Sequence, residues 1–108
     1  MRDKLAEAKF KTAQDLGMNA ALFDFSGNLL DIHIRRQCGR APNLTGTRWV
    51  EFVHADDAPR VMLFFNSTRP TTSFRFWGWQ SHEYAQVLIS KELIGAPGDG
   101  CFFCVFNT

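Results

Sequence analysis

Residues 20–34, AALFDFSGNLLDIHI, contain two apolar runs that flank a Ser-Gly-Asn turn signal. The runs, residues 20–25 and residues 29–34, each have the length and composition of a strand. Gly27 suits a tight turn between them because glycine adopts a positive φ without steric cost. The short connection therefore predicts an antiparallel hairpin early in the chain.

The residues before this hairpin predict a helix that begins after Asp3 as its N-cap and stops at Gly17. Its apolar stripe consists of Ala6, Phe10 and Ala13, which are four and three residues apart. A helix of about four turns is only marginally stable in isolation. We therefore expect the stripe to pack on its own domain or on a second copy of the chain.

The residues after the hairpin predict further helices and then three strands. The predicted elements are a helical turn over residues 49–53, a helix over 58–65, and strands over 72–79, 83–89 and 101–107. Asp56 or Asp57 could accept bonds from the first free amides of the longer helix. Strands at both ends with helices between them predict an α+β fold. We expect a five-stranded antiparallel sheet with short helices on one face and an N-terminal cap helix.

Length and composition limit the classes of function. The chain has 108 residues, enough for one domain with one core, and a net charge of +1, which argues against nucleic-acid binding by broad electrostatics. No apolar run reaches the length of a membrane span, and the first residues do not resemble a signal peptide. Three cysteines without an export signal fit a reducing compartment, so we expect a cytoplasmic protein.

The residues that most often carry chemistry are dispersed in this sequence. Cys101 and Cys104 look like a metal-binding pair, but in a strand they point to opposite faces and cannot hold one metal or form a disulfide. His33, His54 and His82 are scattered, without metal-ligand spacing. We therefore expect no catalytic residue and no metal site, and the chain is not expected to be an enzyme.

The order of elements and several short motifs resemble those of a PAS domain. Residues 23–30 match the family's pattern of Asp, two residues, Gly, one residue and a large aliphatic side chain. Residues 44–53 look like the segment that leads to the family's His-Pro-Asp-Asp motif, which reads His-Ala-Asp-Asp at residues 54–57. His33 falls where many PAS domains have Asn. The resemblance covers about residues 18–107.

This resemblance implies a sensor or signal-input module of a regulatory protein, such as a bacterial sensor kinase or transcription regulator. Residues 1–17 would form a cap and dimerisation helix, and residues 18–108 the PAS core. The implied partners are a small-molecule ligand and a second copy of the chain, while the effector domain would lie outside these residues.

In PAS domains the ligand lies between the sheet and the helices. The side chains that we expect at such a cavity are His33, Trp49, Phe52, Met62, Phe65, Phe74, Phe76 and Val87. The strand over residues 72–79 would place two Trp side chains on the opposite face, where the N-terminal helix is the obvious cover. The expected dimer or helix-docking surface therefore consists of Ala6, Phe10, Ala13, Trp77 and Trp79.

The ligand itself stays open. Haem-binding PAS domains usually carry a His on the long helix, and residues 58–66 contain none. Flavin photoreceptor domains carry a reactive Cys in a Gly-x-Asn-Cys-Arg-Phe-Leu-Gln motif, which the surroundings of Cys38 do not match. Neither haem nor a photoreactive flavin is therefore expected.

Two other interpretations are kept open. One is a cone-shaped α+β enzyme or binding protein of the ketosteroid-isomerase type, which would need Asp24 or Asp31 as a base inside the cavity. The early strand pair argues against it, because such folds usually begin with longer helices. The other is a purely structural PAS module with a filled core and only a protein partner.

Overall fold

The computed structural model describes residues 3–35, 42–96 and 98–108, and its fold is α+β. The helices are α1 (Lys4–Asp15), the 3-10 helix η1 (Arg48–Phe52) and α2 (Ala58–Phe65). The strands are β1 (Ala20–Asp24), β2 (Leu29–His33), β3 (Thr71–Gly78), β4 (Glu83–Ile94) and β5 (Cys101–Asn107). They form one antiparallel sheet in the order β2-β1-β5-β4-β3, so β2 and β3 are its edges.

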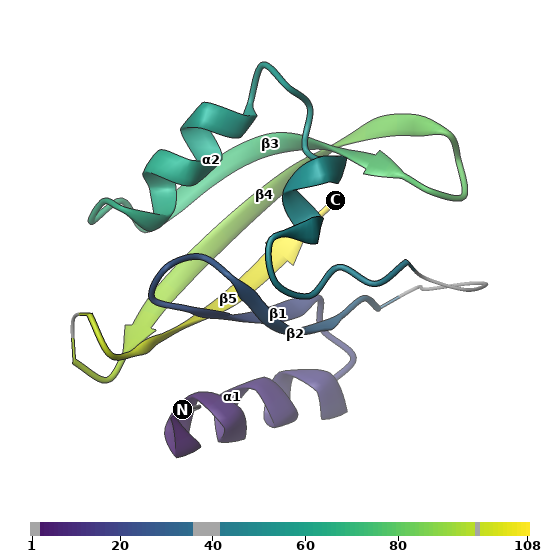
Figure 1. Ribbon diagram of the computed structural model, residues 1–108. Coiled ribbons are helices and arrows are strands. Elements are labelled where there is room, and N and C mark those ends of the chain that lie inside the picture. Colours follow the sequence, from purple (N-terminus) through teal and green to yellow (C-terminus); the bar gives the residue numbers. More distant parts are fainter. Residues whose placement is uncertain (1–2, 36–41, 97) are drawn as a thin grey trace.

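The helices cover both faces of this sheet. Figure 1 shows α1 on one face and η1 with α2 on the other. The larger core cluster lies between the sheet and the η1–α2 face, and a smaller one lies under α1. We call these faces the inner and the outer face of the sheet. No helix among the described residues has the length and apolar character needed to cross a membrane.

The N-terminal helix docks on its own sheet. Asp3 caps it, with Oδ1 accepting from the amides two and three residues further on. The predicted stripe of Ala6, Phe10 and Ala13 is buried, and it packs on outer-face residues that include Leu22 of β1. The sequence left open whether the stripe packs on its own domain or on a second copy of the chain. In the structure it packs on the sheet of its own chain.

The β1–β2 hairpin is organised by its own side chains. Asp24 Oδ1 accepts from the amides of Ser26 and Asn28, both at 2.9 Å. Gly27 has a φ of +87°, which confirms the predicted need for glycine at this turn. The Gly27 carbonyl accepts a bond from Trp49 Nε1 at 3.2 Å, which fastens the hairpin tip to η1.

The expected faces of β2 need a correction. Strict alternation along residues 29–34 predicts that Leu30 and Ile32 share one face. In the structure Leu30 packs with the outer cluster and Ile32 with the inner one. The cause is a register irregularity between Leu22 and Phe23 of β1, where the pairing partner jumps from Asp31 to Leu29. Such a bulge breaks the alternation on which the prediction depended.

The two cysteines of β5 lie on opposite faces, as predicted. Cys101 belongs to the outer cluster and Cys104 to the inner one, and both are free thiols. Burial raises the pKa of the Cys104 thiol far above its usual range. Cys104 therefore acts as a small apolar core residue.

Candidate ligand cavity

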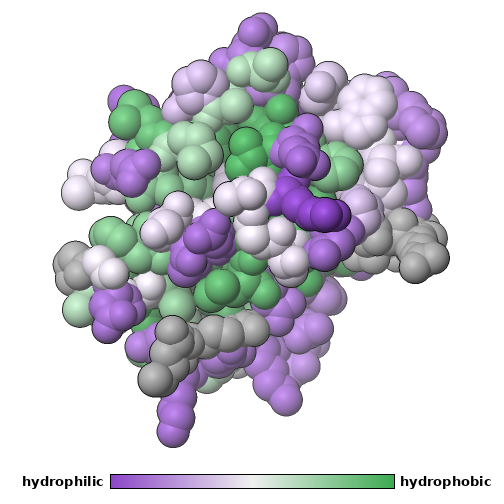
Figure 2. All heavy atoms as spheres, viewed as in Figure 1, coloured by the Kyte–Doolittle hydropathy of each residue, from purple (hydrophilic) through white to green (hydrophobic). Residues whose placement is uncertain are grey.

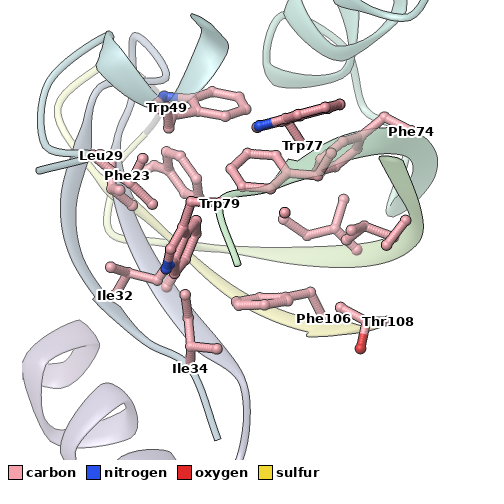
Figure 3. A pocket seen from close by; sticks show the side chains of 17 residues that line it. Phe23, Leu29, Ile32, Ile34, Trp49, Phe74, Trp77, Trp79, Phe106 and Thr108 are labelled. Carbon is pink, nitrogen blue, oxygen red and sulfur yellow. The ribbon is translucent and has the colours of Figure 1, made fainter. Parts of the chain in front are cut away.

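A cavity of about 190 Å³ lies on the inner face of the sheet. The residues that line it come from all five strands, from η1 and from the segments next to them, and most of them are apolar (Figure 3). Examples are Phe23, Ile32, Trp49, Val87 and Phe106. Ligand sites in proteins are mostly apolar with a few placed polar groups, so the composition of this wall suits a small ligand.

The aromatic side chains at one end of the cavity hold one another in place. The Trp49 ring meets Phe23 edge to face at 5.2 Å between centroids and Phe65 at 5.7 Å. Its Nε1 donates to the Gly27 carbonyl, so the indole is fixed by a hydrogen bond as well as by packing. This end of the wall is therefore preformed.

Trp79 contributes its ring to the wall, while its one polar side-chain atom, Nε1, does not face the open space. Trp79 follows the end of β3, lines the cavity and packs against the inner core cluster. Its Nε1 is buried and has no hydrogen-bond acceptor among the described residues. The remaining polar side chain of the lining, Thr108, is exposed at the end of the chain. A buried donor without a partner is rare in folded proteins and calls for an explanation.

Four of the eight residues expected at the cavity line it: Trp49, Phe74, Phe76 and Val87. Two others are core residues behind its wall. Phe52 stacks on Phe76 at 5.8 Å, and Phe65 is buried against Phe23 at 4.7 Å. These two support the wall without facing the open space.

The other two expected residues lie elsewhere. Met62 is 40% exposed on the outer side of α2, whose buried face consists of Val61, Phe64 and Phe65. Hydrophobic residues gather over α2 in Figure 2. Leu63 of the same helix is also exposed. An apolar type alone does not fix the face, because each helical step turns the side chain by about 100°.

His33 lies on the α1 side of the sheet. It pairs with Ala20, which is buried in the outer cluster, and its Nδ1 lies 2.7 Å from the Met18 carbonyl. Because a carbonyl only accepts, Nδ1 donates this bond. His33 thus ties β2 to the α1–β1 connection and does not reach the cavity.

The expected common surface of α1 and two Trp residues is not formed. Trp77 and Trp79 both line the cavity, and the Trp77 ring also meets Tyr84 edge to face at 5.1 Å. The strand order explains the difference, since α1 packs on β1 and β5 while β3 is the far edge. Leu29, Ile32, Ala85 and Ile89 also line the cavity and were missed. Alternation with Val87 was a usable signal for Ala85 and Ile89, whereas Leu29 and Ile32 are three residues apart and share a face only because of the bulge.

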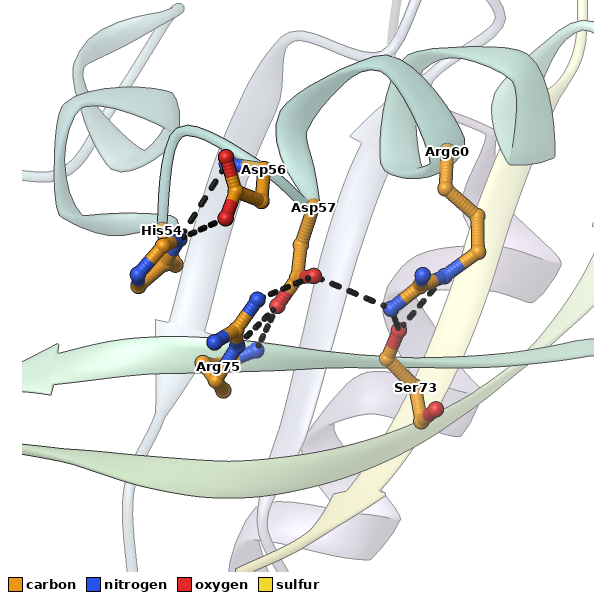
Figure 4. Close-up of polar contacts among 6 residues, drawn as sticks. All are labelled: His54, Asp56, Asp57, Arg60, Ser73 and Arg75. Atoms are coloured by element: carbon orange, nitrogen blue, oxygen red, sulfur yellow. Dashed lines mark hydrogen bonds and ion pairs between the residues drawn. The ribbon is translucent and has the colours of Figure 1, made fainter.

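The His-Ala-Asp-Asp motif forms a polar cluster with β3 (Figure 4). Asp57 Oδ2 accepts from the Arg75 amide at 2.8 Å and from Arg75 Nε at 2.9 Å, and Oδ1 accepts from Arg75 Nη2 at 3.0 Å. These hydrogen bonds hold the pKa of the Asp57 carboxyl well below its usual range. Asp57 occupies the N-cap position of α2, but its side chain makes no bond to helix amides, so the predicted capping role is wrong.

This cluster also covers the edge of the sheet. The Ser73 carbonyl accepts from Arg60 Nη2 at 2.6 Å, and the Arg75 carbonyl accepts from the His54 amide at 2.9 Å. With the Asp57 bond to the Arg75 amide, three main-chain groups along this edge of β3 have partners from the α2 side: the Ser73 carbonyl and the amide and carbonyl of Arg75. A covered edge cannot pair with a strand from another chain, and the cluster is therefore best explained as structural.

Lys91 is a cation on the inner face of the sheet. Its Nζ donates to the carbonyls of Phe64 and Ser67 and lies over the rings of Phe64 and Phe102. Burial lowers the pKa of Lys91. Lys91 is outside the cavity lining and caps the C-terminal end of α2, where a positive charge is favourable.

Asp24 and Asp31, the carboxylates that an isomerase-like function would need, both lie outside the lining. Asp24 accepts bonds within its turn, and Asp31 accepts from the Ile32 amide. Within the described ranges, His, Cys, Asp and Glu side chains form no group of three that could hold a metal. Cys38 lies outside the described residues.

Comparison with known protein families found no family model that matches this chain, and comparison with curated proteins found no match either. The geometry of the cavity and the motifs of the sequence are therefore the basis of the functional proposal.

Proposed function

We propose that this chain is a PAS-type sensor module that binds a small ligand in the cavity between the inner face of its sheet and η1. The observation that carries the proposal is the cavity of about 190 Å³ with an almost wholly apolar wall. The resemblance in motif order points to the same function. As part of a longer regulatory protein in the cytoplasm, the module would report ligand binding to an effector domain.

The volume sets the size of the ligand. An apolar cavity of roughly 150 Å³ in another protein stays dry and binds benzene. A cavity of about 190 Å³ therefore accepts one ring with a few further atoms. Cavities for drug-sized ligands start at about 300 Å³, so the resting cavity favours a compact ligand.

The sheet offers a route for the signal. In β1, Ala21 and Phe23 face the cavity, while Ala20 and Leu22 contact the α1 side. A ligand that shifts β1 thus acts on a strand that also supports α1, and it would bias the packing of the helix. With the cavity saturated, the hydrogen-exchange rates of α1 amides should change, and unchanged rates would rule out this route.

Native mass spectrometry of freshly purified protein tests ligand binding. We expect a species heavier than the 12.3 kDa chain, whose extra mass is lost on denaturation. The Ala85→Trp variant adds a ring at an exposed position of the cavity wall and should abolish the extra mass. The matched control is Gln86→Trp, which adds the same ring to the next residue of β4, on the opposite face.

The same measurement can also contradict ligand binding. A wild-type protein that carries no extra mass, and takes up none from a mixture of small aromatic compounds, contradicts a ligand-binding function. The structural module with only a protein partner would then be the better interpretation.

A further inference from the structure

We infer that the ligand is an amphiphile whose compact apolar group fills the cavity, while its polar group stays in solvent at an opening beside Ala85 and Thr108. The inference rests on the proposed ligand-binding function and specifies how the ligand is built and oriented. It is drawn from two features of the cavity, the polarity of its wall and the position of its opening.

The wall offers no partner to a polar group. Among the described residues that line the cavity, none turns a polar atom towards the open space. Trp49 Nε1 donates to the Gly27 carbonyl, and Trp79 Nε1 has almost no accessible surface. A polar or charged group enclosed here would lose its water and gain no hydrogen bond, which costs far more than apolar contacts return. The enclosed part of the ligand is therefore apolar.

The cavity has a buried end and an open end. Phe23, Leu29 and Trp49 line it and are buried, whereas Ala85 and Thr108 line it and are exposed. A side chain that lines a cavity and is also exposed to solvent marks its opening. Thr108 lies across the open space from Trp49 in Figure 3.

The strand register places the two exposed residues at the same end of the sheet. β4 begins at Glu83, and β5 ends at Asn107, which pairs with Leu88. Ala85 near the start of β4 and Thr108 just after β5 therefore both lie towards the β3–β4 hairpin. Neither side chain is charged, so a polar group of the ligand can stay hydrated there beside an apolar interior.

Tryptophan fluorescence follows binding, because all three tryptophans of the chain line the cavity. The first test uses the wild-type chain and compares benzoate with benzene, and phenylbutyrate with propylbenzene, so that each pair differs by one carboxylate. In phenylbutyrate the ring and the carboxylate are at opposite ends of the chain. The carboxylate should weaken binding by at least about tenfold in benzoate, whose ring cannot reach the buried end while the charge stays in water. In phenylbutyrate it should weaken binding by less than about threefold.

Charges placed at residue 85 locate the polar group. Ala85→Lys and Ala85→Glu put opposite charges at the opening, and the probes are phenylbutyrate and phenylbutylamine, whose charges are also opposite. The ratio of their affinities should differ by roughly fivefold or more between the two variants, with phenylbutyrate favoured in Ala85→Lys. The difference should shrink at high salt, which screens exposed charges. The matched controls are Gln86→Lys and Gln86→Glu, which place the same charges on the opposite face and should leave the ratio nearly unchanged.

The outcomes separate the two claims. If the probes bind but the ratio is the same in Ala85→Lys and Ala85→Glu, the polar group lies elsewhere; the inference is then wrong and the ligand-binding function stands. Binding of benzene and propylbenzene alone has the same meaning, because the ligand would then be wholly apolar and enclosed. If no probe binds, both claims are overturned. Because the carboxylate pairs are measured on the wild-type chain, the test holds even where a variant does not fold.

Discussion

Asp57, the last residue of the His-Ala-Asp-Asp motif, takes its structural role from Arg75, a residue distant in the sequence. Its buried carboxylate accepts three hydrogen bonds from Arg75, and Arg60 Nη2 lies 3.4 Å from Oδ1. The sequence indicated a structural role for the motif, but as a helix cap. The actual partner is 18 residues away in the chain, on an edge strand, so local pattern could not identify it.

Replacing Asp57 by Asn should destabilise the fold by removing the charge that holds Arg75. Because the pKa of Asp57 is lowered in the folded state, the stabilisation is present above the unfolded-state pKa of about 3.9 and is lost as the pH falls below it. We expect the Asp57→Asn variant to melt roughly 5 °C lower than the wild type at pH 7. The difference should shrink as the pH is lowered from about 5 towards 2.

Asp56→Asn is the control for this measurement. The Asp56 side chain is 79% exposed, and its loss should change the melting temperature little at any pH. An Asp57→Asn effect that stayed constant down to pH 2 would show that packing, not charge, makes Asp57 important.

For whole elements, the residue pattern predicted where several helices and strands lie, but not how the strands are arranged in the sheet. The helix predicted over residues 58–65 and the strand over 101–107 coincide with α2 and β5, because apolar periodicity and turn residues act over a few neighbours. The face of the sheet on which each side chain lies was less predictable. A bulge reversed the expected alternation in β2, and the strand order placed Trp77 and Trp79 at the sheet edge far from α1. Both depend on pairing between distant segments.

The docking of α1 leads to a prediction about Phe10, which is buried under the sheet's outer face. Phe10→Ala should lower the free energy of unfolding by about 3–5 kcal/mol, through lost burial and the cavity left behind. Urea denaturation at several protein concentrations measures it. The difference in the free energy of unfolding between Phe10→Ala and the wild type should not depend on protein concentration, because the contact lies within one chain.

Leu16→Ala provides the comparison from the same end of the chain. Leu16 is 71% exposed, so its truncation should change the free energy of unfolding by less than about 0.5 kcal/mol. A Phe10→Ala effect that grew as the protein was diluted would instead place the stripe at an interface between two copies.

Across the whole molecule, the two faces of the sheet are covered unequally. The inner face carries the cavity and the η1–α2 cover, whereas α1 packs only on the β1 and β5 part of the outer face. In β4, Val87 and Ile89 point into the core, so Leu88 between them points outward and is 54% exposed. If the chain dimerises as its PAS resemblance implies, the part of the outer face around Leu88, which α1 does not cover, could form the apolar contact between two copies.

Leu88→Lys therefore tests dimerisation at the sheet. A charge at the centre of an apolar interface must be desolvated, so the substitution should weaken self-association at least tenfold in sedimentation equilibrium. Leu63→Lys is the matched control, because Leu63 is 64% exposed but lies on α2, which covers the opposite face. Loss of association in Leu63→Lys alone would move the interface to α2. A wild-type chain that stays monomeric at all concentrations would refute the dimer and leave α1 with a structural and signal-relaying role within one chain.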